Sequence, residues 1–453
     1  MGHGEPTIRA VRVFSHDVQH PLRQDAGVGC RNPMVPIGVR MWSFDASMPV
    51  PNTTQDPILS RSENQCRARV QVGQVHRRHT LLGSMVRQPH SFAVIGAGMA
   101  GATVAQALAR AGCRVHVFDK ARGPGGRLAT RRVEWTDRQG NATVTRLDHG
   151  ALGFKAHDPA FQAFADRAAR DGWLAEWKPR VAPGSAPREG DAVFYVPVPD
   201  MPALCRHLLD GVSMSLSFAV DGLHPGPQGW QVQAGALRHA ESFDAVLLAL
   251  PPAQAATLLD PYRPDWARQA SAALMQPCWT LMGIADDPKP DLGWDLARTS
   301  SGPVAWVLRS DSRPGRAKVP GQAHWVAHAR TDWSLRHLEQ PAAWVQSQMQ
   351  AALAECAGSP VDWHHCTVHR WRYALPPADG ATAPGETAWY DAAQGLGVCG
   401  DFFGTSGVEG AWLSAQSLCA AMLQRTADGV DESTPSVEAV VDPTRKAARH
   451  PEA

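Results

Sequence analysis

The pattern of apolar and polar positions changes sharply near residue 90. Residues 1–84 show no sustained strand or helix period, and they combine arginine, without any lysine, with scattered Pro, Gly and Asn. Compact domains seldom begin with so long a patternless segment. We therefore interpret residues 1–84 as a disordered extension or a mis-assigned start, with Met85 as the alternative first residue. Residues 426–453 are polar and patternless, which predicts a disordered tail.

The clearest pattern of apolar and polar residues begins at Phe92. Phe92–Ile95 is a short apolar run that predicts a buried strand, and Gly96–Gly101 predicts a tight turn. Ala102–Ala111 has the composition of a helix, and Arg114–Asp119 predicts a second strand. Strand, helix and strand within about thirty residues are typical of a βαβ unit in a parallel sheet. The uncharged stretch 91–109 is about as long as a membrane span, but its three glycines and its alanines favour the βαβ interpretation.

Later segments predict further elements. Ser213–Val220 and Trp230–Ala234 alternate like antiparallel strands of a small meander, whereas Phe243–Leu250 is a continuous apolar strand. Ala342–Cys356 and Trp412–Leu423 have helical patterns. The order of elements predicts an α/β protein.

Composition narrows the class of protein. The 453 residues are 44% hydrophobic and 19% charged, which is typical of a globular protein with two or three cores. A net charge of +1 argues against a nucleic-acid partner. An Arg-rich nucleic-acid arm at 1–84 stays open as a minor alternative, testable by salt-dependent DNA binding. Nine cysteines without a CxxC pair predict neither a disulfide framework nor a zinc site, so a cytoplasmic location fits best.

The first chemical motif is Gly96-Ala97-Gly98-Met99-Ala100-Gly101. Gly96 permits a tight turn, Gly98 lets a pyrophosphate approach the backbone, and Gly101 lets the helix pack on the strand. The phosphates would lie at the helix N-terminus, where free N–H groups favour anions. Asp119 ends the next strand, where a carboxylate binds the hydroxyls of an unphosphorylated ribose. The context predicts dinucleotide binding.

A second glycine turn, Lys120–Arg127, follows Asp119 directly. A plain nicotinamide dehydrogenase needs no such turn. FAD does, because the backbone passes close to its pyrophosphate and ribityl chain while a guanidinium offsets the charge. The alternative is an exposed basic loop.

A third motif lies near the C-terminus, where a strand ends at Gly400-Asp401 and a helix begins near Val408 and Glu409. The helix start can direct N–H groups toward the N1/C2 region of a flavin, and Asp401 can accept a hydrogen bond from the ribityl chain. By itself this segment is equally well a turn with a helix cap.

In these motifs the chain resembles the renalase-like FAD-dependent oxidoreductases, a branch of the amine-oxidase and glutathione-reductase-type flavoproteins. The resemblance spans residues 91–425 and also rests on the segments LDHGA (147–151), VPDMPAL (198–204) and HRWRYALP (369–376). The DHGA and HRWRYALP segments are the ones more specific to the renalase-like branch.

The resemblance implies a Rossmann-like FAD-binding domain that is discontinuous in sequence and a second, mixed-sheet substrate domain. The FAD-binding domain would comprise 91–150, 198–260 and 392–425. The substrate domain would comprise 151–197 and 261–391.

It also implies roles for particular residues. Gly98 and Ala100 would contact the pyrophosphate, Asp119 the adenosine ribose and Arg127 the flavin. The full set of predicted cofactor positions is Gly96, Gly98, Met99, Ala100, Gly101, Asp119, Lys120, Gly126, Arg127, Ala151, Leu152, Gly153, Asp401, Val408 and Glu409. Family members often carry Gln and an aromatic residue where this chain has Leu152 and Gly153, which affects the expected substrate more than the cofactor.

Other candidate chemistry is weaker. Val361–Trp371 predicts a strand, so His365 and His369 share one face while His364 and Cys366 share the other, and we predict no metal site. Cys399 lies in an apparent strand and is expected to be buried rather than to anchor a flavin, so we expect the FAD to be non-covalent. Trp371 and Tyr373 are the candidate substrate-pocket residues, because planar rings suit stacking on a flavin or an aromatic substrate.

These observations predict an FAD-dependent oxidoreductase that transfers a hydride from a small substrate to flavin N5. The resemblance implies dihydronicotinamide isomers as substrate, with oxygen as a candidate oxidant. We expect no membrane partner. Because the cofactor supplies the chemistry, no catalytic residue is assigned. The alternatives are an amine oxidase or desaturase of the same superfamily, and a flavin-binding sensor or scaffold without turnover.

Overall fold

The computed structural model describes residues 90–427, apart from 186–192, 288–291, 377–384 and 405–406. The prediction for residues 1–84 lies outside the described residues. So does the predicted tail 426–453, except for Thr426 and Ala427, which are helical and not part of a disordered tail. Within the described part, no helix has the length and apolar content needed to cross a membrane.

A six-stranded sheet forms the first core, in the order β17-β18-β11-β1-β2-β7. Neighbouring strands are parallel, except for the antiparallel pair at the β17 edge. Its strands are β1 (Ser91–Ile95), β2 (Arg114–Asp119), β7 (Ser213–Leu216), β11 (Ala245–Leu248), β17 (Trp389–Asp391) and β18 (Leu396–Val398). The predicted βαβ unit is confirmed, because α1 (Met99–Arg110) connects β1 to β2.

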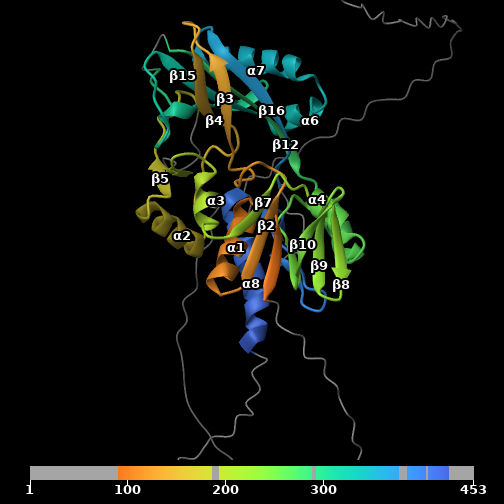
Figure 1. Cartoon of the computed structure of the whole chain (residues 1–453). Helices are drawn as coiled ribbons and strands as arrows, with labels where there is room; N and C mark the ends of the chain where they lie inside the picture. The colour runs from red at the N-terminus through yellow and green to blue at the C-terminus, as the bar shows by residue number, and fades with distance from the viewer. Residues whose placement is uncertain (1–89, 186–192, 288–291, 377–384, 405–406, 428–453) are drawn as a thin grey trace, which may run out of the picture. The chain divides into compact units, whose positions relative to one another are not determined.

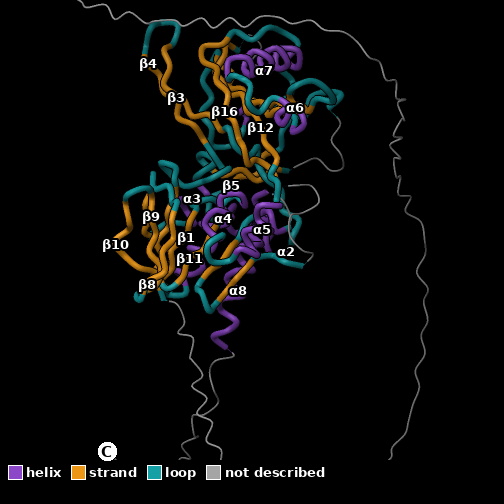
Figure 2. The backbone as a smooth tube through the Cα atoms, turned by 90° about the vertical axis from the view of Figure 1, so that its right-hand side faces the viewer, coloured by secondary structure: helices purple, strands orange, loops and turns teal. Residues whose placement is uncertain are grey.

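Both faces of this sheet are covered. On one face α1 packs beside α8 (Gly407–Ala427), and this core also takes in α2 (Pro159–Arg170) and α3 (Ala203–Leu208) (Figure 1). On the other face lie a three-stranded antiparallel meander and two short helices (Figure 2). These elements are β8 (Gly222–Gly226), β9 (Gly229–Ala234), β10 (Leu237–Phe243), α4 (Pro252–Leu259) and α5 (Pro264–Ala272). The side chains of β1 alternate between the two cores, which explains its uninterrupted apolar run.

Two predicted strands were wrong in detail. Ser213–Val220 does not belong to the meander, because β7 pairs in parallel with β2 at the edge of the six-stranded sheet. An edge strand is half exposed, so it alternates like a meander strand, and alternation does not reveal the partner. Phe243–Leu250 is two strands, since the Asp244 carboxylate accepts hydrogen bonds from the His90 and Ser91 N–H groups and separates β10 from β11.

A five-stranded sheet forms the second core, in the order β13-β14-β15-β12-β16. Its named strands pair antiparallel, and the mixed character we predicted is limited to one parallel bridge between Val181 and Leu296. The strands are β12 (Gln276–Asp286), β13 (Leu296–Arg298), β14 (Val304–Arg309), β15 (Gln322–Ala329) and β16 (Trp363–Leu375).

Helix α7 (Ala342–Ala357) packs on one face of this sheet (Figure 1). The hairpin of β3 (Thr130–Thr136) and β4 (Ala142–Asp148) packs on the other face. The remaining described elements are β5 (Leu174–Trp177), β6 (Phe194–Pro197), α6 (Thr331–Arg336) and the short 3-10 turns Ser310–Ser312 and Asp401–Phe403. The predicted α/β class with a second sheet-containing domain is confirmed.

Candidate cofactor and substrate site

The first glycine motif forms the junction between β1 and α1. Helix α1 begins at Met99, three residues before the predicted start at Ala102, so the turn is shorter than expected. The close approach depends on Gly101, because a Cβ atom there would lie 1.8 Å from the Gly96 carbonyl oxygen. No side chain of the described residues caps the helix at Gly98, so N–H groups of its first turn are left for an anion.

The Asp119 carboxylate connects the two glycine turns. One of its oxygens accepts a hydrogen bond from the Ala97 N–H at 2.7 Å, and the other accepts one from the Ala121 N–H at 2.7 Å. The Gly125 N–H donates to the Ala97 carbonyl at 2.8 Å. The two turns predicted to hold one ligand are therefore in direct contact.

Gly98 and Gly126 face each other across this contact. Among the described residues, a Cβ atom on Gly98 would meet only the Gly126 Cα within 4 Å, at 3.8 Å. The surface over Gly98 is therefore open and free of side chains. Lys120, also in the predicted set, donates to Gln254 at 3.3 Å.

Arg127 and Asp401 form a two-pronged ion pair between the second and third motifs. The two guanidinium nitrogens lie 2.6 and 2.7 Å from the two carboxylate oxygens. The Asp401 side chain is buried, whereas that of Arg127 is one-third exposed. The Gly407 N–H, at the start of α8, donates to the same carboxylate at 3.3 Å.

Val408 and Glu409 occupy the first turn of α8, as predicted. The buried Glu409 carboxylate, however, accepts hydrogen bonds from the N–H groups of His157 and Asp158 and lies 3.0 Å from His157 Nδ1. Burial by itself raises the pKa of the Glu409 carboxyl, but these hydrogen bonds outweigh it and hold the pKa below its ordinary value. Through these hydrogen bonds the carboxylate of Glu409 holds the start of α8 against the segment before α2.

The DHGA segment lies along the second glycine turn. The Ala151 N–H donates to the Arg127 carbonyl at 3.0 Å, and the His149 N–H donates to the Ala129 carbonyl at 3.0 Å. A Cβ atom on Gly150 would lie 2.0 Å from the Arg127 carbonyl oxygen, so only glycine fits there. This packing places Ala151 directly beside Arg127.

Strand β16 carries the HRWRYALP segment, which contacts the DHGA segment and Arg127. Trp371 Nε1 donates to the His149 carbonyl at 3.0 Å, and the two rings stack with centroids 5.3 Å apart. Arg127 also donates to the Ala374 carbonyl at 3.1 Å. Tyr373 lies two residues beyond Trp371, where the register between β16 and β12 shifts, and it is half-buried.

The sequence analysis missed the ion pairs that hold the DHGA segment in place. Buried Asp148 pairs with Arg313 at 3.0 Å and with Arg316 at 2.8 Å. Burial by itself raises the pKa of the Asp148 carboxyl, but the two guanidinium groups outweigh it and hold the pKa below its ordinary value. The fully buried Arg313 also donates to the Leu152 carbonyl at 3.0 Å. Asp148 belongs to the LDHGA segment, which was the available signal, but nothing in the sequence pointed to its partners.

Leu152 and Gly153, where family members often carry Gln and an aromatic residue, lie in tightly packed surroundings. Leu152 packs against the core between the five-stranded sheet and the β3–β4 hairpin. A Cβ atom on Gly153 would lie 3.1 Å from carbon atoms of both Phe194 and Val196. A bulky ring at position 153 would therefore require β6 to move.

The predicted division of the β16 histidines between two faces was wrong for His364. The register with β12 shifts beside this residue, and its ring packs on Trp135 of β3, whereas Cys366 packs on the α7 side of the sheet. His364 Nε2 lies 2.7 Å from Asp286 Oδ1, whereas His369 lies toward His149, with ring centroids 4.9 Å apart. Burial lowers the pKa of His149 to about 3 and that of His369 to about 4, and nearby positive charge adds to both effects. Both rings are neutral at physiological pH. Cys399 is fully buried, and burial raises the pKa of its thiol.

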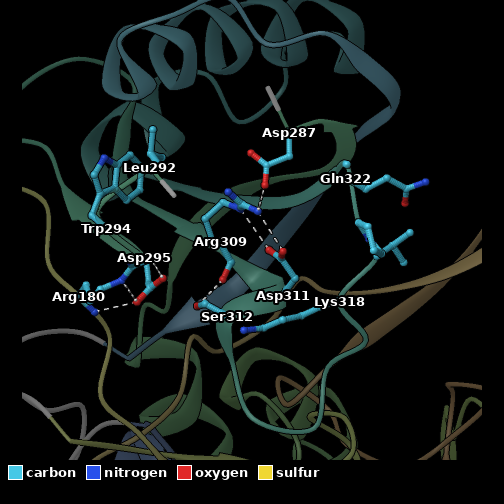
Figure 3. Close-up of a pocket in the computed structure, with 13 residues that line it drawn as sticks. Arg180, Asp287, Leu292, Trp294, Asp295, Arg309, Asp311, Ser312, Lys318 and Gln322 are labelled. Atoms are coloured by element: carbon cyan, nitrogen blue, oxygen red, sulfur yellow. Dashed lines mark hydrogen bonds and ion pairs between the residues drawn. The ribbon is translucent and has the colours of Figure 1, made fainter. Parts of the chain in front are cut away.

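A separate polar pocket of about 260 Å³ lies on the five-stranded sheet (Figure 3). Its central Arg309 donates to Asp287 at 2.9 Å and to Asp311 at 3.0 Å, and Arg180 pairs with Asp295 at 3.0 Å. None of the predicted cofactor or substrate residues lines this pocket. Because its principal cations already have carboxylate partners, we assign it no ligand.

The assembled segments fit an extended dinucleotide. They combine an uncapped helix N-terminus, a side-chain-free surface over Gly98, the Asp119 carboxylate at the end of β2, and a guanidinium beside the start of α8. A flavoprotein with a parallel dinucleotide-binding sheet is the class that this fold and site define.

Comparison with known proteins gives the family. A family of NAD(P)-binding Rossmann-like domains matches residues 94–168, and the family described as flavin containing amine oxidoreductases matches residues 187–423. The second match covers more than half of the chain. The chain belongs to the flavin containing amine oxidoreductase family. It is an FAD-dependent oxidoreductase.

Two solved structures agree with this chain on the fold. A putative protoporphyrinogen oxidase from Exiguobacterium sp. 255-15 has a TM-score of 0.56 and 11% identity, covering 74% of this chain and 99% of that one. A protein from Pyrococcus furiosus has a TM-score of 0.50 and 12% identity, covering 74% and 97%. Cyclohexylamine oxidase from Brevibacterium oxydans IH-35A has a TM-score of 0.45 and 13% identity, covering 75% and 100%. At these identities the likeness concerns the fold alone.

Proposed function

We propose that the protein is a renalase-like oxidoreductase that oxidises isomers of a dihydronicotinamide dinucleotide. Bound FAD would supply the redox chemistry, with a hydride from the substrate as the reductant and oxygen as the final oxidant. This proposal goes one step beyond family membership, because it selects a substrate class within the family.

The observation that carries the proposal is the contact between Trp371 and His149. It joins HRWRYALP to DHGA, the two segments on which the resemblance to the renalase-like branch depends. The Trp371 ring provides a planar wall against which an aromatic substrate can pack. We propose that Trp371 and Tyr373 line the substrate pocket, and that the predicted cofactor positions hold a non-covalent FAD.

The neutral histidines agree with hydride transfer that needs no protein acid or base. Deprotonated His149 and His369 carry no proton that they would release near neutral pH. Their contribution is to orient the substrate and to limit water around the reacting carbon. We therefore assign no catalytic acid or base.

Amine oxidation is the second candidate, because the matched family is described by that activity. A protonated amine would meet the guanidinium group of Arg131 beside the DHGA segment, whereas the charge of Arg127 is balanced by Asp401. Like charges disfavour its binding. We therefore rank amine oxidation below dihydronicotinamide oxidation.

The test is an anaerobic visible spectrum of the purified FAD-loaded protein, mixed with dihydronicotinamide isomers and then with a panel of amines. We expect the isomers to bleach the oxidised flavin band rapidly. Bleaching by amines alone would replace the proposal with amine oxidation. No bleaching by any donor would favour a sensor or scaffold.

A matched variant strengthens this test. Trp371→Phe keeps a ring but removes the N–H that donates to the His149 carbonyl, so we expect slower reduction by the isomers with FAD still bound. Trp344→Phe changes a half-exposed tryptophan of α7 and should leave the reduction rate unchanged.

We also retain the domain division, a small-molecule partner and a cytoplasmic location as proposals. The proposed division assigns 91–150, 198–260 and 392–425 to the FAD-binding part and 151–197 and 261–391 to the substrate part. Limited proteolysis of the holoprotein tests the division, and cell fractionation tests the location.

A further inference from the structure

Arg131 lies on the face of β3 that packs against the five-stranded sheet. Val133 and Trp135, which alternate with it along the strand, are buried in that interface, whereas Arg132 and Glu134 are exposed on the opposite face. Arg131 Nη2 lies 3.1 Å from His369 Nδ1 on β16. The guanidinium of Arg131 is thus directed toward the histidine and tryptophan cluster beside the DHGA segment.

The charge of Arg131 is not balanced within the described part of the chain. Arg127 is paired with Asp401, and Arg313 and Arg316 are paired with Asp148. Arg131 has no carboxylate within ion-pair distance among the described residues, although it is half-buried and burial lowers its pKa. A partly buried cation without a counter-charge is costly unless a ligand supplies the charge.

The surrounding histidines do not supply a negative counter-charge for Arg131. Burial and the charge of Arg131 lower the pKa of His149, of His365 and of His369, so all three are neutral near pH 7. His369 Nδ1 therefore accepts the hydrogen bond from Arg131. His149 Nδ1 and His365 Nε2 are buried and make no hydrogen bond within the described residues. The cluster offers polar atoms and one positive charge.

We propose that Arg131, together with His369 and His149, binds an oxyanion of the substrate, a carboxylate or a phosphate group. A guanidinium has five N–H donors in a planar fork that matches two oxygens of such a group, and His369 engages only part of that fork. The stacked ring of Trp371 closes one side of the cluster. Arg131 is then a residue that selects anionic substrates over protonated amines.

This inference rests on the proposed function in one respect, the position of the substrate beside the DHGA segment. Its test is therefore a binding measurement that involves no flavin reduction. If dihydronicotinamide isomers fail to reduce the flavin, the proposed function is wrong while anion binding is still measured. If anions fail to bind, the inference is wrong whichever donor reduces the flavin.

The experiment is isothermal titration calorimetry of the full-length FAD-loaded protein with four probes of similar shape: benzoate, phenyl phosphate, benzamide and benzylamine. We expect the two anions to bind more tightly than benzamide, and benzylamine to bind weakest. Preference for phenyl phosphate over benzoate identifies phosphate as the recognised group, and the reverse identifies carboxylate. Tighter binding of benzylamine than of both anions overturns the inference.

Three variants locate the effect. Arg131→Gln should weaken binding of the preferred anion about 10- to 100-fold, the usual effect of losing a charge-assisted pair of hydrogen bonds. Arg131→Lys keeps the charge and should bind the anion with an affinity between those of the wild type and Arg131→Gln. If Arg131→Gln folds poorly, Arg131→Lys still tests the proposal. Arg132→Gln, its exposed neighbour paired with Glu134, is the matched control and should leave the affinity unchanged. An Arg131→Gln protein that is folded and binds the anion like the wild type refutes the proposal, as does equal weakening in Arg132→Gln.

Discussion

The buried ion pairs of Asp148 make a quantitative prediction about how the DHGA segment is held. The Asp148 side chain is almost fully buried, and it lies within 3.0 Å of the guanidinium of Arg313, which is completely buried, and 2.8 Å from that of Arg316. Asp148→Asn keeps the shape and a carbonyl oxygen but removes the negative charge. The substitution therefore opens no cavity, and its effect is electrostatic.

The expected size follows from leaving two buried guanidinium groups without their carboxylate. Breaking a buried pair by removing one partner destabilises proteins by about 3–5 kcal/mol. With an unfolding entropy of about 2.1 cal/mol/K per residue, this corresponds to a fall in Tm of about 4–7 °C for a folded chain of this size. Arg313→Met in the same background should restore part of the loss, because it removes one of the uncompensated charges.

Differential scanning calorimetry of the FAD-saturated proteins measures this effect. Asp332→Asn removes one partner of an exposed pair with Arg336 and is the control, with an expected change in Tm within about 1 °C. A Tm for Asp148→Asn that matches the wild type or this control would refute the electrostatic reasoning.

The pH dependence gives a second check on the same variant. The pKa of Asp148 in the folded protein lies below its ordinary value of 3.8. The stabilisation by its charge is therefore complete above the unfolded pKa of about 3.9 and is lost as pH falls through the lower folded pKa. The difference in Tm between wild type and Asp148→Asn should stay constant from about pH 5 to pH 8. A difference that changes over this range would show that another group causes it.

Three further predictions concern the cofactor site and its supports. Gly98→Ala should fold normally but bind FAD more weakly in fluorescence titrations, since the new Cβ fills open space over the turn. Gly101→Ala should instead reduce the yield of folded protein, because its Cβ would collide with the backbone. Arg127→Ala should raise the Kd for FAD about 10-fold or more, because it leaves the buried Asp401 carboxylate without its guanidinium partner, and an unchanged Kd would contradict this role. Glu409→Gln should lower Tm at pH 7, where the carboxylate is ionised. The difference in Tm from the wild type should shrink as pH falls through the folded pKa of Glu409, which lies below its ordinary value of 4.5. A difference that grows on acidification would be inconsistent with the hydrogen bonds that the Glu409 carboxylate accepts.

The family and the cofactor could be predicted from the sequence because both depend on local requirements of the backbone. A glycine is needed where α1 begins against the preceding turn, and this need is visible as GxGxxG whatever the rest of the chain does. The strand before it and the carboxylate of Asp119 after it follow from short-range pattern in the same way. The shared face of His365 and His369 was likewise predictable, because side-chain direction in a regular strand alternates with residue number. The position of His364 was not, because the register shift beside it arises from the pairing of β16 with β12.

Strand partners were not predictable to the same degree. The alternating segment that contains β7 was assigned to a meander, yet it pairs in parallel with β2. The separation of β10 from β11 at Asp244 was also missed, because the hydrogen bonds that define it come from residues 90 and 91. Periodicity describes how one strand is exposed, whereas its neighbours depend on how the whole chain packs.

The sequence by itself determined the α/β class, the dinucleotide-binding turn and the type of cofactor, since these are encoded in spacings of a few residues. Only the tertiary structure decided which charges meet. Arg127 and Asp401 lie 274 residues apart, and Arg131 and His369 lie 238 apart. Whether a guanidinium has a carboxylate partner depends on contacts between distant strands and loops. Arg127 pairs with Asp401, whereas Arg131, four residues further on, has no carboxylate partner among the described residues, and this difference became visible only with the fold.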